Sequence, residues 1–314
     1  MHTEQKTSKS ISILMVLAAA SMWGCIGIFV HRLNDYGLSS FQMAFMRCFT
    51  CVILMLFYLL IMDRSKLKID KKDLGWFALN GLVSIFIMYS SYPLAVLATN
   101  MSTAVILLYT APAFVMLFSV LFFHEKLTGR KMICLFLCVL GSALVSGLIG
   151  GIVLKPTGLF FGLLSGISYA LYSIFSAIIL KKYHPFTNIV YSFGFASIAC
   201  FLVSKPGELV QIFSGTPQAL FWAVANGLVT CFISYLIYTM ALTRIRPSTA
   251  SIIATIEPVV ATVVGVLLYQ ETLTLSGIAG IIMVLAALIL QNLPAGRIRR
   301  HGRGNGVEQN KNRC

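Results

Sequence analysis

Glu257 is an ionisable residue inside a long apolar run, where a charge is costly. It lies about nine residues into the run 248–269, which is near mid-membrane if the run is a spanning helix with a rise of about 1.5 Å per residue. Small residues share its helical face, so this face should point into a helix bundle: Ala250, Ala254, Ala261 and Gly265. Glu257 is a candidate for proton coupling or substrate binding. The alternative is a structural carboxyl group that is always paired or neutral.

Arg47 is the only basic residue inside an apolar run, and it lies in the segment 40–62. It is roughly 10 Å from the nearer end of this run at the rise of a helix. At that depth its side chain either snorkels to the membrane surface or contacts a carboxylate of the protein or of a substrate. A direct pair with Glu257 is one form of the second hypothesis.

Four tyrosines form two pairs spaced i, i+3 in the runs 74–97 and 220–242: Tyr89 with Tyr92, and Tyr235 with Tyr238. Aromatic faces attract ammonium groups, so the pairs are candidates for a cavity wall. Each pair also lies towards the end of its run, which equally fits a belt of tyrosines at the membrane interface.

Two prolines and two asparagines occupy apolar runs. Pro112 and Pro258 lie mid-run, where proline removes a backbone hydrogen bond and favours a kink. Kinked helices often line cavities in membrane proteins, and tolerance in packing is the alternative. Asn80 and Asn226 are expected to make interhelical hydrogen bonds, worth roughly 0.6–2 kcal/mol each.

These residues must be positioned by membrane helices. Of the 314 residues, 58% are apolar and 11% are charged, against roughly 45–50% and 25% in soluble domains. This composition excludes a soluble monomer and a disordered chain. The apolar runs are too long for barrel strands, so we expect an all-α membrane protein. The runs predict ten spans: 11–30, 40–62, 74–97, 102–122, 132–152, 158–180, 187–203, 220–242, 248–269 and 276–291.

The basic residues orient these spans. Of the 24 Lys and Arg residues, 20 fall on one side of the ten-span arrangement, three on the other, and Arg47 within a span. The positive-inside rule then predicts cytoplasmic termini, in a chain that we expect in the plasma membrane. The net charge of +14 therefore indicates orientation, and no nucleic-acid partner is expected. Cys48 and Cys51 are spaced C-x-x-C without a second pair, so neither a metal site nor another cofactor is expected.

The chain contains an internal repeat with a constant offset of 146 residues. Residues 74–95 align with 220–241, and 11 of these 22 positions are identical. The same offset lays Pro112 on Pro258. Five spans make an odd unit, so the two copies should be inverted in the membrane, an arrangement that suits alternating access. We predict four segments: a cytoplasmic N-terminus 1–10, a first five-helix repeat 11–152, a second 158–291, and a disordered basic tail 292–314.

The ends of the repeated helices carry a resemblance. Pro112 is followed by an apolar run and Glu125-x-Leu127, and Pro258 by Glu271-x-Leu273. With the layout of five plus five spans, this pattern resembles the EamA family of the drug/metabolite transporter superfamily. The resemblance implies a proton- or gradient-driven carrier, often an exporter of amino acids or other small metabolites. It also implies that spans five and ten are peripheral.

The leading hypothesis is therefore a secondary transporter with a small-molecule substrate, and the alternative is a membrane channel or a non-transporting scaffold. No catalytic residues are assigned, because no intramembrane His or Asp accompanies Glu257, and no Gly-Lys dipeptide forms a phosphate-binding loop. Expected partners are the substrate and the lipid bilayer, and a second copy of the chain is a further candidate as a homodimer.

Overall fold

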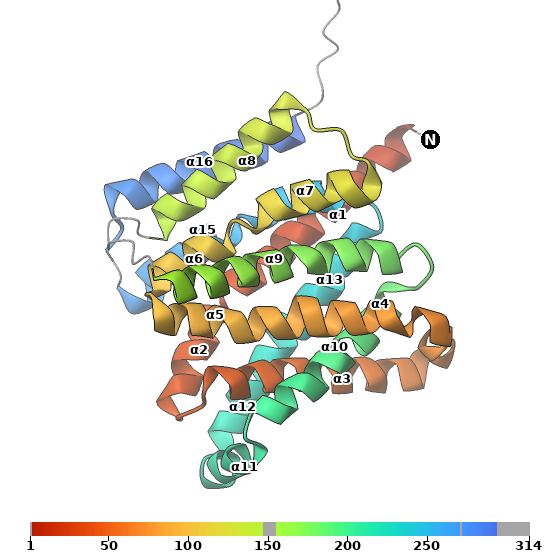
Figure 1. The fold of residues 1–314 in the computed structure, drawn as a ribbon, viewed down its shortest axis with the longest axis vertical. Coiled ribbons are helices and arrows are strands. Elements are labelled where there is room, and N and C mark those ends of the chain that lie inside the picture. Colours follow the sequence, from red (N-terminus) through yellow and green to blue (C-terminus); the bar gives the residue numbers. More distant parts are fainter. Residues whose placement is uncertain (1, 147–154, 271, 294–314) are drawn as a thin grey trace, which may run out of the picture.

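The computed structural model describes residues 2–146, 155–270 and 272–293. All regular structure in these ranges is helical (Figure 1). The α-helices are α1 His2–Gly24, α2 Ile26–Asp35, α3 Ser40–Met62, α4 Leu74–Leu79, α5 Ile87–Ala98, α6 Met101–Leu108, α7 Ala111–Phe123, α8 Gly129–Val145, α9 Pro156–Ile179, α10 Pro185–Val203, α11 Pro206–Gly215, α12 Pro217–Gly227, α13 Ser234–Leu242, α14 Pro247–Ala254, α15 Glu257–Tyr269 and α16 Leu275–Asn292.

The predicted all-α membrane class is confirmed. Within the described residues, nine helical segments are long and apolar enough to cross a membrane. The tenth is α8, a shorter apolar helix of 17 residues. The predicted fifth span continues to residue 152, and its last part lies outside the described residues. The short helix α11 was not predicted, because residues 204–219 contain polar residues and two prolines; Pro206 begins this helix and Leu209 buries it against the bundle.

Five of the spans consist of helical segments that differ in type or are interrupted. In the first span, α1 and α2 are separated by Cys25. The segments α4 and α5 are joined by a π-helix, η3 Asn80–Phe86, and α12 and α13 are joined by another, η5 Leu228–Ile233. The α6 and α7 helices are separated by two residues, as are α14 and α15. Proline stands at the second position of both α7 and α15, where its missing N–H and its ring prevent the preceding helix from continuing.

The two repeats have the same local structure at the offset of 146. The bounds of α6 and α7 correspond residue for residue to those of α14 and α15. Each of these spans ends in a left-handed residue, His124 (φ 51°) or Gln270 (φ 55°). Thr128 and Thr274 then cap α8 and α16 through their hydroxyl oxygens. The repeat seen in the sequence is therefore a structural duplication.

Equivalent helices of the two repeats run in opposite directions. The thiol of Cys134 donates to the carbonyl oxygen of Ala287 at 3.5 Å. Further along α8, Gly141 faces Gly280, which precedes Ala287 in α16. A Cβ on Gly141 would lie 2.9 Å from the carbonyl oxygen of Gly280, and a Cβ on Gly280 would lie 2.5 Å from the carbonyl oxygen of Gly141. As the α8 residue number rises, its α16 partner's number falls, so α8 and α16 are antiparallel. The fold is two inverted five-helix repeats.

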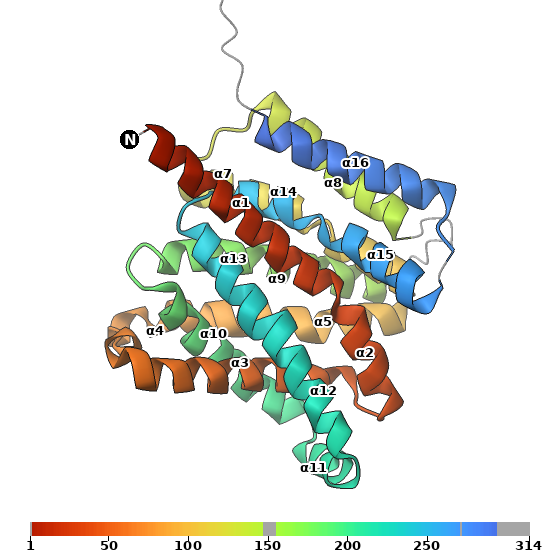
Figure 2. The same cartoon turned by 180° about the vertical axis from the view of Figure 1, so that it is seen from behind.

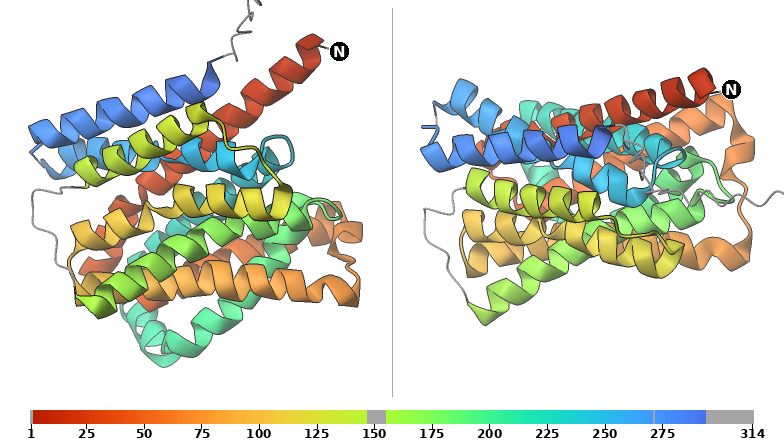
Figure 3. Two further views of the ribbon diagram at one scale, coloured as in Figure 1. Left: turned by 45° about the horizontal axis from the view of Figure 1, so that its top comes forward. Right: turned by 90° about the horizontal axis from the view of Figure 1, so that it is seen from above.

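The α8–α16 pair forms an outer edge of the bundle (Figures 1 and 2). The helices α3 and α10 lie side by side away from that edge. Between them lie α7 and α9 on one face and α1, α13 and α14 on the other, and the view turned by 45° keeps the same order (Figure 3, left). Spans five and ten are therefore peripheral, as the resemblance implies.

Candidate functional site

A small cavity lies where the interrupted spans of the two repeats meet. One interruption contributes Tyr109 and Pro112, and the other contributes Thr255 and Glu257, while α9 and α13 supply the remaining wall. Tyr109 and Thr255 are equivalent positions at the offset of 146. The cavity therefore lies at the interface of the repeats, where transporters with inverted repeats bind their substrates.

Of the described residues that line this cavity, Glu257 alone is acidic and none is basic. It is the first residue of α15, so its carboxylate lies at the positive end of that helix dipole. The hydroxyl of Tyr169 donates to Glu257 Oε2 at 3.3 Å, and Tyr109 is a second hydroxyl neighbour. The side chain is half-buried because its carboxylate faces the cavity. This arrangement offers an acceptor to a cationic ligand or to a proton.

The predicted tyrosines lie inside the bundle. Tyr89, Tyr235 and Tyr238 are 7%, 3% and 3% exposed, so the interfacial-belt interpretation is wrong for these three. Tyr238 lines the cavity and shares a hydrogen bond of 2.8 Å with Ser173. Tyr92 is half-buried and interacts electrostatically with Glu257.

Arg47 is buried, with 9% of its surface exposed, so the expectation that it snorkels is wrong. Its Nη2 donates to the carbonyl oxygen of Thr230 at 3.1 Å, and its guanidinium carbon lies 4.6 Å from the centre of the Tyr89 ring. Thr230 belongs to the π-helix η5, which presents this carbonyl oxygen to the guanidinium. Nε is buried without a hydrogen-bond partner, and no ion pair with Glu257 is present among the described residues.

A chain of aromatic side chains connects the surroundings of Arg47 with those of Glu257. Tyr89 stacks on Arg47 and neighbours Tyr235. The Trp23 ring lies 5.0 Å from Tyr235 and 6.2 Å from Tyr169, which donates to Glu257. The guanidinium and the carboxylate are therefore separated by aromatic rings.

The two asparagines differ in their contacts. Asn80 Nδ2 donates to Ser176, Asn188 and Ser192, which belong to α9 and α10. Asn226 instead accepts from Thr230, one turn on in its own span, at 2.7 Å. Interhelical hydrogen bonds were predicted for both asparagines. Asn80 makes them, whereas this bond of Asn226 lies within its own span.

Three residues of the site were not predicted: Trp23, Tyr109 and Tyr169. Tyr109 had a usable signal, because it precedes Pro112 by three residues and therefore falls on the interruption that the proline causes. Trp23 and Tyr169 are aromatic residues in apolar runs, and nothing in their spacing distinguishes them from core residues. Within the described residues, no group of three or more His, Cys, Asp or Glu side chains could hold a metal ion.

Comparison with known proteins places these features in context. The profile of the EamA-like transporter family matches residues 10–147 and 156–293. An uncharacterized transporter of Archaeoglobus fulgidus is 29% identical over 88% of this chain and 94% of its own length. Uncharacterized transporter YxxF of Bacillus subtilis is 25% identical over 95% of this chain and 93% of its own length.

A solved crystal structure of a protein with 14% sequence identity superposes with a TM-score of 0.75. The match covers 90% of this chain and 96% of the other. At this identity the similarity concerns the fold alone, and it supports the helix arrangement described above.

Proposed function

The chain belongs to the EamA-like transporter family, and we propose that it is a secondary transporter that exports amino acids or related small metabolites. Transport proceeds by alternating access around the cavity at Glu257, and a proton or substrate gradient drives it. The observation that carries this proposal is the meeting of two equivalent interrupted spans at a cavity with a single carboxylate. Family membership and the transporter relatives indicate a multi-pass membrane transporter rather than an enzyme.

The substrate class follows from the charges around the cavity. An ammonium group would be held by the Glu257 carboxylate and by the faces of the surrounding tyrosines. The buried guanidinium of Arg47, whose Nε lacks an acceptor, would receive the substrate carboxylate once the aromatic layer at Tyr235 separates. The two sites are complementary in charge to a zwitterion.

The orientation in the membrane and the proton coupling are proposed from charge. The distribution of 20 basic residues against three supports cytoplasmic termini in the plasma membrane. A carboxylate in a dry cavity can exchange a proton for a substrate ammonium group, because either one neutralises it. Glu257 would therefore bind substrate when ionised and release it when protonated.

The Glu257→Gln variant tests this proposal in proteoliposomes. Glutamine keeps the shape and hydrogen bonding of the side chain but cannot ionise. We expect net amino-acid flux driven by a pH gradient to fall to background, and the KM of substrate exchange to rise about tenfold, because a charge-assisted hydrogen bond is lost. Scintillation counting of labelled substrate measures both fluxes on the same preparation.

Glu208→Gln is the matched control, since Glu208 is an exposed acid in α11. It should leave net flux and exchange unchanged. If Glu257→Gln shows the net flux and pH dependence of the unmodified protein, the carboxylate is structural and the proposed coupling is wrong.

A further inference from the structure

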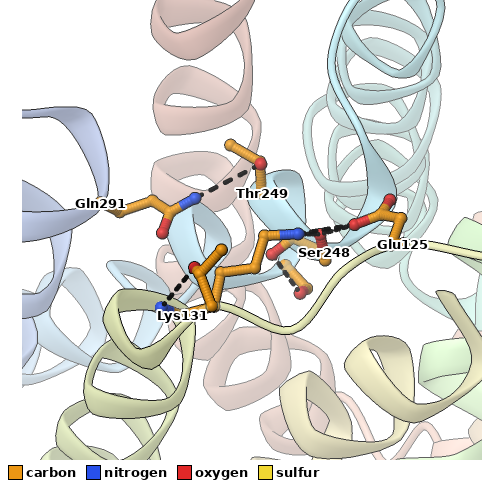
Figure 4. Close-up of polar contacts among 7 residues, drawn as sticks. Glu125, Lys131, Ser248, Thr249 and Gln291 are labelled. Carbon is orange, nitrogen blue, oxygen red and sulfur yellow. Dashed lines mark hydrogen bonds and ion pairs between the residues drawn. The ribbon is translucent and has the colours of Figure 1, made fainter. Parts of the chain in front are cut away.

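A buried ion pair of the first repeat is hydrogen-bonded to the second repeat at the end of the bundle where the loop after α7 lies (Figure 4). Glu125 Oε2 accepts hydrogen bonds from Lys131 Nζ at 2.7 Å and from Ser248 Oγ at 2.5 Å. Lys131 Nζ also donates to Ser248 Oγ at 2.9 Å. Glu125 and Lys131 belong to the first repeat, whereas Ser248 is the second residue of α14 in the second repeat. The three side chains thus close a triangle across the interface of the repeats.

The burial of this triangle distinguishes it from the other loop contacts at the same end. The Lys131 and Glu125 side chains are 12% and 4% exposed. The ion pairs of Lys182 with Asp70 and Asp73 also cross between loops, but Lys182 is 55% exposed. Exposed pairs contribute little, since water and salt screen them. Separating a buried pair leaves uncompensated charges and is costly unless both groups become hydrated.

The triangle lies one helical turn from the cavity. Ser251 lines the cavity, and its hydroxyl donates to the carbonyl oxygen of Ser248 at 3.2 Å, one turn earlier in α14. Ser248 and Ser251 are three residues apart, so the same face of α14 contacts the ion pair at its first turn and the cavity at the next. A second bond steadies this turn, since Gln291 Nε2 of α16 donates to Thr249 Oγ1 at 3.3 Å (Figure 4).

The repeat offset shows that this arrangement belongs to one end only. Ser248 corresponds to Ser102, but Lys131 corresponds to Gly277 and Gln291 to Val145. The second repeat therefore has no lysine at the position that completes the ion pair. Two ends that are related by the repeat consequently differ in the charge available to hold them shut.

We propose that Glu125, Lys131 and Ser248 form a gate that seals the cavity at this basic end, and that the missing lysine makes the opposite end the easier one to open. The proposal rests on the proposed transport function, because a gate presupposes a cavity that opens to both sides. The gate opens only when water enters and hydrates Glu125 and Lys131. The closed state is stable because separating the buried pair without this hydration is costly.

Cysteine accessibility tests the gate without any substrate. Ser251→Cys places a thiol of nearly the same size on the cavity wall beneath the triangle. A membrane-impermeant methanethiosulfonate is added to vesicles from the face that carries the Glu125 loop, and mass spectrometry of the peptide that contains the introduced thiol follows its labelling. Adding Lys131→Met to this chain should raise the labelling rate about tenfold, because loss of the ion pair favours the open state. A factor of this size is within the usual range for energetic coupling between two sites in a protein. Ser248→Ala should raise it by a smaller factor, because the ion pair itself remains.

Lys126→Met is the matched control, since it removes the same charge from the same loop at an exposed position. It should leave the labelling rate unchanged. Each variant is first passed over a size-exclusion column, and Ser248→Ala gives the decisive comparison if Lys131→Met does not elute as a folded protein. Labelling that is equal in the Lys131→Met, Ser248→Ala and Lys126→Met chains would overturn the gate.

This readout separates the gate from the transport proposal. Faster labelling in a chain that moves no amino acid would support the gate and count against the substrate class. Unchanged labelling in a chain with normal amino-acid transport would reject the gate and leave the transport proposal standing.

Discussion

Glu257 and Arg47 are charged side chains inside membrane-spanning segments, and their surroundings differ. Glu257 faces a cavity and two tyrosine hydroxyls. Arg47 is enclosed by a backbone carbonyl and an aromatic ring, with one nitrogen left without an acceptor. Buried polar groups without partners are rare in proteins, and each calls for an explanation. The proposed explanation is a substrate carboxylate that completes the coordination of Arg47.

The Arg47→Met variant tests that explanation by substrate chemistry. Methionine retains apolar volume at a position where removing the whole charge can be tolerated. We expect it to lose transport of a zwitterionic amino acid while transport of the corresponding amine, which lacks the carboxylate, changes little. Uptake of both labelled compounds into proteoliposomes measures the difference.

Arg32→Met serves as the control, since Arg32 is exposed at the end of α2. It should affect neither compound. Equal loss of amino-acid and amine transport in Arg47→Met would assign Arg47 to the structure of the bundle instead.

At the level of the helices, glycine determines how closely the spans approach. Gly81 lies in the π-segment of the third span and packs on α10, and a Cβ there would lie 2.3 Å from the carbonyl oxygen of Ser192. Its equivalent, Gly227, packs on Thr50 of α3 in the same way. Small residues at such crossings allow the close backbone contacts on which membrane helices depend.

Gly81→Ala should therefore destabilise the protein by about 1–3 kcal/mol, because α10 must move to accommodate the methyl group. The apparent unfolding temperature in detergent should fall by several degrees. Gly194→Ala is the control on α10 itself, where a Cβ meets nothing within 4 Å. A similar fall in both variants would show that helix propensity rather than the close approach sets the effect.

The sequence was sufficient to predict the membrane-spanning helices, but not α11 or all contacts between helices. Apolar runs predicted the ten spans, and the offset of 146 predicted that Pro112 and Pro258 would occupy equivalent helices. Tyr169 and Trp23 were not predicted as site residues, because an aromatic residue in an apolar run has no pattern that reveals which neighbour it will face. The Glu125–Lys131–Ser248 contact was also not predicted. It joins Glu125 in a loop and Lys131 in the first turn of α8 to a helix 117 or more positions away, and charges at a membrane edge are ordinarily solvated.

For the whole molecule, duplication explains both the symmetry of the fold and its departures from symmetry. The two repeats place equivalent interrupted spans around one cavity. Glu257 stands where the first repeat has Ala111, and Lys131 stands where the second has Gly277. The cavity and the closure of its ends are therefore asymmetric in charge although the backbone is repeated. Such a molecule can use one carboxylate for binding and one ion pair for closure.

Counterflow in proteoliposomes tests the central claim, that this molecule carries a substrate by alternating access, most directly. Vesicles containing the purified chain are loaded with an unlabelled amino acid and diluted into a trace of the labelled one. A carrier exchanges one for the other, so labelled substrate should accumulate transiently above its equilibrium level, with an initial rate that saturates with concentration. Labelled flux that rises linearly with concentration and shows no overshoot would contradict the account and indicate a channel, and flux equal to that of protein-free vesicles across a panel of amino acids and small metabolites would indicate a scaffold.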